Sequence, residues 1–185
     1  FEGQLKRGPT PTGTYYDEVD LSQHLRPNET NTVAVLVWYF GQHGFSHKSS
    51  GRAGLVFDAG PESPLNSDET WKVLRHPAFG STGSPHPNYR LPEHNTRFDA
   101  RQDIGRWQAS DFDDSAWSQA QSHGSPPTGP WGELWGRPIP QWRTSDLQPY
   151  ENDATLPEIS TGGVIKGKLP YNAQVTPYLK IDAPA

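Results

Sequence analysis

The chain has 185 residues, no cysteine and a formal net charge of −5. Its length allows one sizeable β-sandwich, or one domain and a piece of a second. The charge excludes the basic stripe that nucleic-acid binding requires, the lack of cysteine excludes disulfides and thiolate chemistry, and no run approaches the roughly 18 apolar residues of a membrane span. Seven Trp, seven Tyr and seven Phe are typical of a chain that folds.

Strand signals dominate the chain, because no apolar pattern with helical spacing continues over several turns without Pro or Gly. The clearest strand is predicted at residues 32–40, where a continuous β-branched and aromatic run is typical of a central strand covered on both faces. Shorter strands are predicted at residues 54–58, 71–75 and 174–181, each bounded by turn residues. Together these signals predict an all-β fold, a jelly-roll-like antiparallel β-sandwich with long loops.

The composition of the chain changes after Trp142. Residues 143–170 are polar and have few apolar anchors, which is typical of a connection between domains. We therefore expect a β-sandwich domain at residues 1–145. Residues 146–185 are expected to hold a linker and the first strand of a following, truncated β-domain, or a strand that returns to the first sheet.

The carboxylates of the acidic turn at residues 111–117 are predicted to cap it by accepting hydrogen bonds from its backbone. A calcium site is the alternative, but the calcium loop of helix-loop-helix sensors needs a glycine in its middle and a glutamate at its end. Counted from the first aspartate, this sequence has Ala116 and Ser122 there. His43 and His47 share no predicted helix that would place them on one metal ion, so a zinc site is disfavoured.

Residues 88–101 mix carboxylate, amide and guanidinium groups with two aromatic rings. Such groups bind sugar hydroxyls, and an aromatic ring stacks on the apolar face of a pyranose. The predicted sugar-binding residues are Glu93, Asn95, Asp99, Arg101 and Trp135. The alternative is that Asp99 and Arg101 form a salt bridge that only pins the loop. Near Trp135, we expect Trp131 and Trp142 in the core.

Several motifs, taken in order, resemble a known family. YYDEVDL at residues 15–21, followed by residues 31–37, resembles the β-sandwich domains that accompany the catalytic domains of many glycoside hydrolases. FDAR at residues 98–101, followed by Trp107 and by DDSAW at residues 113–117, is similar to the accessory N-terminal domain of bacterial and fungal α-L-rhamnosidases. The resemblance covers most of residues 5–145, and two further motifs extend it: WYFG at residues 38–41 and RPIP at residues 137–140.

This resemblance implies a jelly-roll fold, an extracellular (secreted) or periplasmic location and a non-catalytic role in which some members bind L-rhamnose with the help of Ca²⁺. The helical toroid that carries the acidic catalytic residues of such enzymes is absent, so we expect no enzyme activity from this chain alone. No cofactor is expected, and both binding with Ca²⁺ and binding without it are compatible with the sequence. The expected partners are a rhamnose-containing glycan and the other domains of the parent hydrolase, with neither nucleic acid nor membrane.

The leading hypothesis is therefore a lectin-like carbohydrate-binding accessory domain that holds rhamnose-containing glycans near the catalytic domain of an α-L-rhamnosidase. One alternative is a structural spacer that docks against the catalytic domain and has no ligand of its own. Another is a fragment of an active rhamnosidase that hydrolyses terminal α-L-rhamnosides. Residues 169–178 resemble the start of the β-domain that follows in such enzymes.

Overall fold

The computed structural model describes residues 9–10, 12–39, 41, 51–85, 87, 95–141, 143, 145–160, 162–172 and 178. The chain divides into two compact units, Phe1–Gln141 and Trp142–Ala185. Helix in the described ranges is confined to two single-turn 3-10 helices, η2 (Ala100–Gln102) and η3 (Asp153–Thr155). The chain is thus mostly non-helical, with a few short strands in small sheets, as expected for its fold class.

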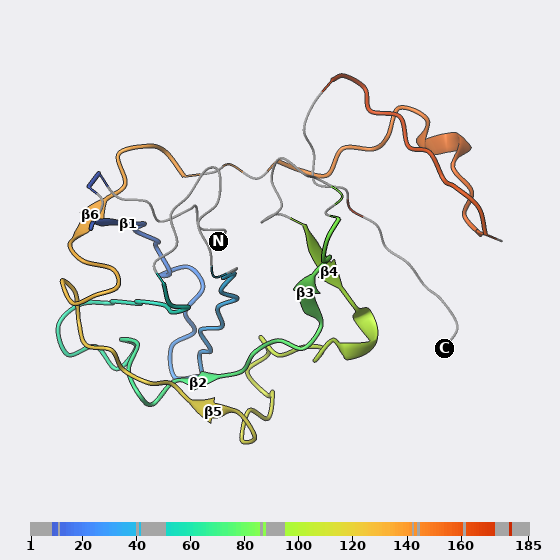
Figure 1. Cartoon of the computed structure of the whole chain (residues 1–185). Helices are drawn as coiled ribbons and strands as arrows, with labels where there is room; N and C mark the ends of the chain where they lie inside the picture. The colour runs from blue at the N-terminus through green and yellow to red at the C-terminus, as the bar shows by residue number, and fades with distance from the viewer. Residues whose placement is uncertain are drawn as a thin grey trace. The chain divides into compact units, whose positions relative to one another are not determined.

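Two strands far apart in the sequence form the first sheet. β1 (Thr14–Tyr16) pairs in parallel with β6 (Leu134–Gly136), and the two lie side by side in Figure 1. The Thr14 hydroxyl donates to the carbonyl of Trp131 at 2.6 Å, which ties β1 to the loop before β6. Gly132 in that loop has φ +63°, and a β-carbon there would lie 1.6 Å from the carbonyl oxygen of Thr12. Only glycine therefore allows the loop to approach β1 so closely.

The other two sheets of the first unit are antiparallel pairs (Figure 1). β2 (Lys72–Val73) pairs with β5 (Ser118–Gln119), and β3 (Phe79–Ser81) pairs with β4 (Thr96–Phe98). A turn capped by Asp68 leads into β2, because its carboxylate accepts from the amide of Thr70 at 2.8 Å and from the Thr70 hydroxyl at 2.6 Å. These bonds hold the pKa of Asp68 below its usual value.

Apolar packing in the first unit is distributed over small aromatic clusters. Ala78, 2% exposed, is the only apolar residue that the described ranges bury completely. The ring of Trp117 contacts those of Trp107 and Phe112, with centroids 6.4 and 5.7 Å apart. Phe79 and Phe98 pair across β3 and β4 at 5.0 Å. These ring contacts form small separate clusters in the described part of the first unit.

Two expectations about strands are wrong. Residues 32–39 form no strand, and their side chains are largely exposed, with Trp38 at 57%. β-propensity measures how well a side chain fits a packed sheet surface, and none of the strands in the described ranges pairs with this run. Pairing is also not purely antiparallel, since β1 and β6 are parallel. The long stretch of chain between these two strands imposes no hairpin and therefore no antiparallel direction.

The remaining strand predictions have mixed outcomes. Residues 54–58 are partly buried at their centre but join no sheet. The run at 71–75 contains β2. Apart from Tyr178, the run at 174–181 lies outside the described residues.

Asn152 makes two of the hydrogen bonds that join the segments of the second unit. Asn152 donates to the carbonyl of Lys166 at 2.9 Å and accepts from the amide of Lys168 at 2.6 Å. The Lys168 ammonium also pairs with the carboxylate of Glu151 at 2.8 Å. Tyr150 lies flat against Gly167, where a β-carbon would meet its ring at 2.6 Å. These contacts join residues 150–152 to residues 166–168 across the loop between them.

No helix in the described parts of either unit is long and apolar enough to cross a membrane.

Candidate functional site

Two of the predicted site residues flank β4. Glu93 lies outside the described residues, whereas Asn95 is partly buried directly before β4. The carbonyl of Asn95 accepts from the amide of Thr82 at 3.2 Å, which extends the pairing of β3 and β4. Asp99 follows β4, and its amide donates to the carbonyl of Ala78 at 2.9 Å. The sheet therefore fixes where residues 95–99 lie.

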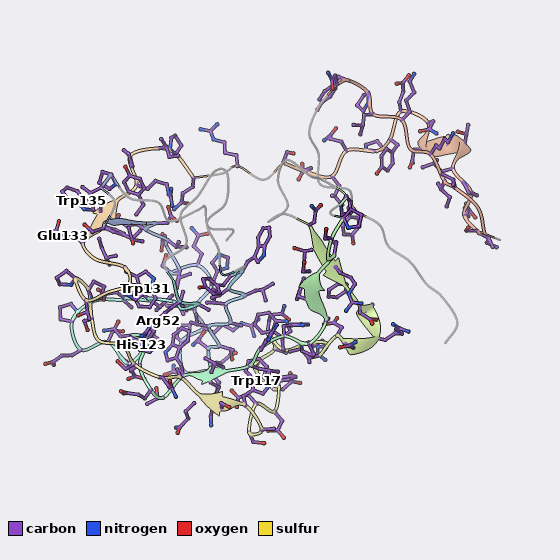
Figure 2. The ribbon with its side chains drawn as sticks, viewed as in Figure 1. Arg52, Trp117, His123, Trp131, Glu133 and Trp135 are labelled. Atoms are coloured by element: carbon purple, nitrogen blue, oxygen red, sulfur yellow. The ribbon has the colours of Figure 1, made fainter. Side chains whose placement is uncertain are left out.

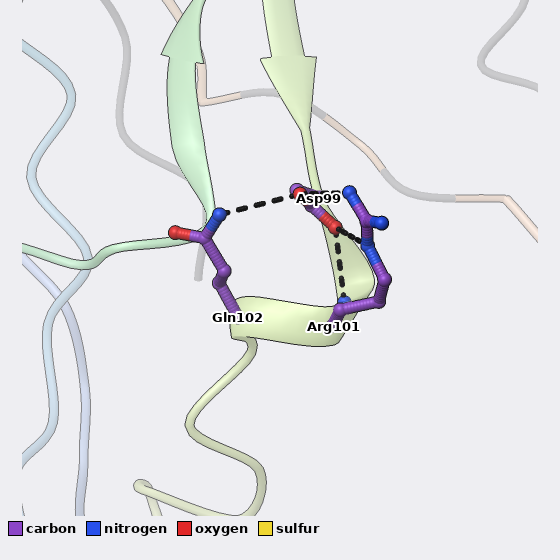
Figure 3. A network of polar contacts seen from close by, with 3 residues as sticks. All are labelled: Asp99, Arg101 and Gln102. Carbon is purple, nitrogen blue, oxygen red and sulfur yellow. Dashed lines mark hydrogen bonds and ion pairs between the residues drawn. The ribbon is translucent and has the colours of Figure 1, made fainter.

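Asp99 is engaged by its own neighbours (Figure 3). Its carboxylate accepts from the Arg101 amide at 3.2 Å, from the Arg101 guanidinium at 2.8 and 2.7 Å, and from the Gln102 amide group at 3.3 Å. The Arg101 guanidinium holds the pKa of Asp99 far below its usual range, and Asp99 raises the pKa of Arg101 in return. The Asp99 side chain is 13% exposed and that of Arg101 88%. This cluster stabilises the single turn of η2. Both carboxylate oxygens of Asp99 already accept hydrogen bonds from residues of that turn.

Trp135 belongs to a different sheet from this cluster. It is the central residue of β6, opposite Tyr15 of β1, and its indole is half-exposed. A β-carbon on Gly13 would lie 3.1 Å from the indole nitrogen, so the ring packs against the backbone there. Figure 2 shows Trp135 beside Glu133 at β6. The structure thus brings Asp99 and Arg101 together but places Trp135 in the β1–β6 sheet.

A groove lies where β1 and β6 end. Its volume is about 360 Å³, near the lower end of the range for small-molecule sites. Both segments contribute polar or aromatic side chains to its lining: Tyr16, Asp17, Glu18, Arg137 and Gln141. The strand register aligns Tyr16 with Gly136, and a β-carbon on Gly136 would lie 3.5 Å from the Tyr16 hydroxyl, so the phenol packs over the glycine while the residue stays 39% exposed. Side chains alternate along a strand, so Trp135 lies on the opposite face from Tyr16.

A buried ion pair forms the base of this groove. The Arg137 guanidinium donates to the two Asp17 oxygens at 2.5 and 3.5 Å, and the side chains are only 6% and 3% exposed. The guanidinium also lies 5.5 Å from the centroid of the Tyr15 ring, within cation–π range. The Arg137 amide donates to the carbonyl of Tyr16 at 3.1 Å, which continues the β1–β6 pairing. Backbone and side chain of Arg137 therefore fix the same end of β1.

The rim of the groove carries a carboxylate and an amide. Gln141 donates to the carbonyl of Glu18 at 2.6 Å, so its side chain closes the groove from the β6 side. The Glu18 side chain is exposed at the rim. A half-exposed phenol ring, an amide and a carboxylate can together stack on and hydrogen-bond to a hydroxylated ligand.

No protein-family model, curated protein or solved structure matches this chain.

The sequence alone does not reveal the groove, because its two halves are 120 residues apart. YYDEVDL at residues 15–21 and RPIP at residues 137–140 were both singled out, but only for the resemblance that they carry. The usable signal was an acidic residue after one short strand and an arginine after another. Opposite charges at the ends of two strands are compatible with neighbouring positions in one sheet.

A second cavity of about 290 Å³ lies beside the loop at residues 57–67. Its polar side chains form hydrogen bonds within the loop. Asn66 accepts from the amide of Ala59 at 2.7 Å and donates to the carbonyl of Gly60 at 2.9 Å, while the Ser67 hydroxyl accepts from the amide of Phe57 at 2.9 Å. These groups are less available to a ligand than those at the rim of the β1–β6 groove.

The described residues contain no cluster of three or more metal-ligating side chains. In the acidic turn, the Asp113 carboxylate accepts from the amide of Ser115 at 3.0 Å, and hydrogen bonding by the side chain and the amide of Ser115 lowers the pKa of Asp113. That is the capping role that the sequence predicts for the turn. His43 and His47 lie outside the described residues. Trp131, expected in the core, is partly buried against Gly54 (Figure 2), and Trp142 lies outside the described residues.

Proposed function

We propose that this chain is a non-catalytic carbohydrate-binding accessory domain of a secreted α-L-rhamnosidase-type glycoside hydrolase. Its fold is then a jelly-roll-like β-sandwich, and it holds rhamnose-containing glycans near the catalytic domain. The β1–β6 groove is the proposed binding site. The observation that carries this proposal is the half-exposed Tyr16 ring beside an amide and a carboxylate, in a groove near the lower end of the small-ligand range.

The chemistry of sugars supports this choice of site. A pyranose has one apolar face that stacks on an aromatic ring, and hydroxyls that pair with amides and carboxylates. The Asp99 carboxylate is less suited, because a sugar hydroxyl would have to displace bonds from Arg101. Trp135 offers a second exposed ring on the other face of the same two strands. Two of the motifs that carry the family resemblance, YYDEVDL at residues 15–21 and RPIP at residues 137–140, contribute to the walls of the groove.

Calorimetric titration of L-rhamnose into the protein, with Ca²⁺ and again with a chelator, tests the proposal. We expect saturable heat with a dissociation constant between about 1 μM and 1 mM. Tyr16→Ala should weaken binding at least tenfold, whereas Tyr16→Phe, which keeps the ring, should bind almost normally. Tyr171→Ala removes an exposed ring from the second unit and serves as the control.

Two further variants locate the site. Asp99→Ala and Trp135→Ala should leave binding within about twofold if sugar occupies the groove. Loss of binding in Asp99→Ala would move the site to residues 95–101. Absence of saturable heat from the unmodified protein in every condition would refute the binding function.

A spacer role is the second candidate, and the exposed run at residues 35–38 favours it. Val35, Leu36, Val37 and Trp38 are consecutive and exposed. Apolar patches of this kind mark surfaces that contact other domains. A spacer that docks against the catalytic domain predicts no heat with any sugar. A fragment of an active rhamnosidase predicts rhamnose release from an aryl rhamnoside, and we expect none from this chain alone.

A further inference from the structure

Three of the residues that line the β1–β6 groove ionise at neutral pH: Asp17, Glu18 and Arg137. Asp17 and Arg137 compensate each other, since they form a two-point ion pair and are almost completely buried. The one cationic side chain among the described lining residues is therefore already paired with a carboxylate. An anionic ligand that competed for Arg137 would have to leave Asp17 buried without its partner, which is strongly unfavourable.

Glu18 sets the charge that a ligand meets. Its side chain is exposed at the rim, and no ion pair joins it to another described residue. Among the described lining residues, two carboxylates and one guanidinium give a formal charge of −1. A carboxylate brought within a few ångströms of Glu18 is repelled, and the repulsion weakens as salt is added.

We infer that the groove selects neutral sugars and disfavours uronic acids, with Glu18 as the residue that determines this selectivity. The inference rests on the proposed function, because it concerns the same site. It adds a ligand class: a neutral deoxyhexose or hexose binds, while a hexuronate in the groove meets Glu18, and the one cation among the described lining residues is already paired with Asp17. A methyl-esterified uronate, which has lost its charge, is accepted like a neutral sugar.

The disaccharide L-rhamnosyl-D-galacturonate, as the free acid and as its methyl ester, isolates the charge. Both forms contain rhamnose and differ by one ionised group. Each is titrated calorimetrically into the protein at pH 7 and low ionic strength, beside L-rhamnose itself. We expect the ester to bind about fivefold tighter than the acid, and the difference to shrink in 0.5 M NaCl, roughly as screened Coulomb repulsion requires.

Variants assign the effect to one residue. Glu18→Gln should bring the acid and the ester to within about twofold of each other. This ratio is the readout, and not the affinity for L-rhamnose, because Glu18 is itself one of the proposed sugar contacts. Glu133→Gln removes the same charge at the other end of β6 and should keep the fivefold difference. Circular dichroism confirms that each variant is folded.

The outcomes separate this inference from the proposed function. Equal affinity for acid and ester, or tighter binding of the acid, would overturn the selectivity while L-rhamnose still binds. A difference that persists in Glu18→Gln would overturn the role of Glu18. Absence of heat from L-rhamnose and from both disaccharides would overturn the proposed function, and the selectivity with it.

Discussion

Removing Asp17 tests whether the β1–β6 groove is built as described. The Arg137 guanidinium has its main anionic partner in Asp17, and both side chains are almost completely withdrawn from water. Asp17→Leu removes this carboxylate and leaves the Arg137 charge buried. The pair also joins the end of β1 to the segment after β6, so its loss loosens the groove as well.

The expected magnitude follows from that burial. Breaking a buried ion pair by removing one partner costs about 3–5 kcal/mol of unfolding free energy. For a unit of this size that corresponds to a fall in melting temperature of about 10 °C or more. Replacing both partners with apolar groups, Asp17→Leu with Arg137→Met, should cost clearly less than Asp17→Leu alone, because no buried charge remains.

Urea unfolding followed by tryptophan fluorescence measures these differences. The control is Glu29→Gln, which removes an exposed ion pair in which the Glu29 carboxylate lies 3.5 Å from the Arg26 guanidinium. It should change the free energy of unfolding by less than about 1 kcal/mol. The reasoning fails if Asp17→Leu is no more destabilising than Glu29→Gln. It also fails if the double variant loses the sum of the two single losses, since that would show that the charges do not interact.

Three shorter predictions concern other parts of the chain. Asp99 has a pKa lowered by Arg101, so its stabilising contribution is complete above the ordinary aspartate pKa and is lost as pH falls through the lower folded value. The urea midpoint should therefore decline in acid less steeply for Asp99→Asn than for the unmodified protein, and identical acid profiles would contradict this. Gly132→Ala places a β-carbon 1.6 Å from a backbone carbonyl oxygen at φ +63° and should lower the unfolding free energy by more than about 1 kcal/mol; an unchanged urea midpoint would refute the close approach. Asn152→Ala removes the two side-chain hydrogen bonds of Asn152 to Lys166 and Lys168, so hydrogen exchange of the Lys168 amide should accelerate, whereas an unchanged rate would show that other contacts protect it.

Local features of this structure could be predicted from the sequence. The scarcity of helix followed from the lack of helical spacing. The salt bridge between Asp99 and Arg101, two residues apart, was one of two alternatives for its segment, and the structure contains it. The capping bond of Asp113 likewise joins residues two apart. Such contacts depend on turn geometry that a few neighbouring residues determine.

Features that depend on distant pairing could not be predicted. The β1–β6 register needs two three-residue strands to meet, and neither carries a strong signal of its own. The run at residues 32–40 carries the strongest strand signal, yet its described part forms no strand. Strand propensity reflects how well a segment packs once another strand lies beside it. The sequence of the segment does not show which strand that is.

The position of the candidate site follows from the same distinction between local and distant contacts. In residues 95–101 the polar groups find partners close by in the sequence, and the Asp99 carboxylate is saturated by residues two and three positions away. At the β1–β6 groove the local chain leaves polar groups at the surface, while the buried pair that supports them comes from segments 120 residues apart. A ligand gains most where hydrogen-bonding groups are held in place but not yet satisfied. The geometry therefore moves the expected sugar contacts from the 88–101 segment to the rim residues Tyr16, Glu18 and Gln141, which composition alone did not favour.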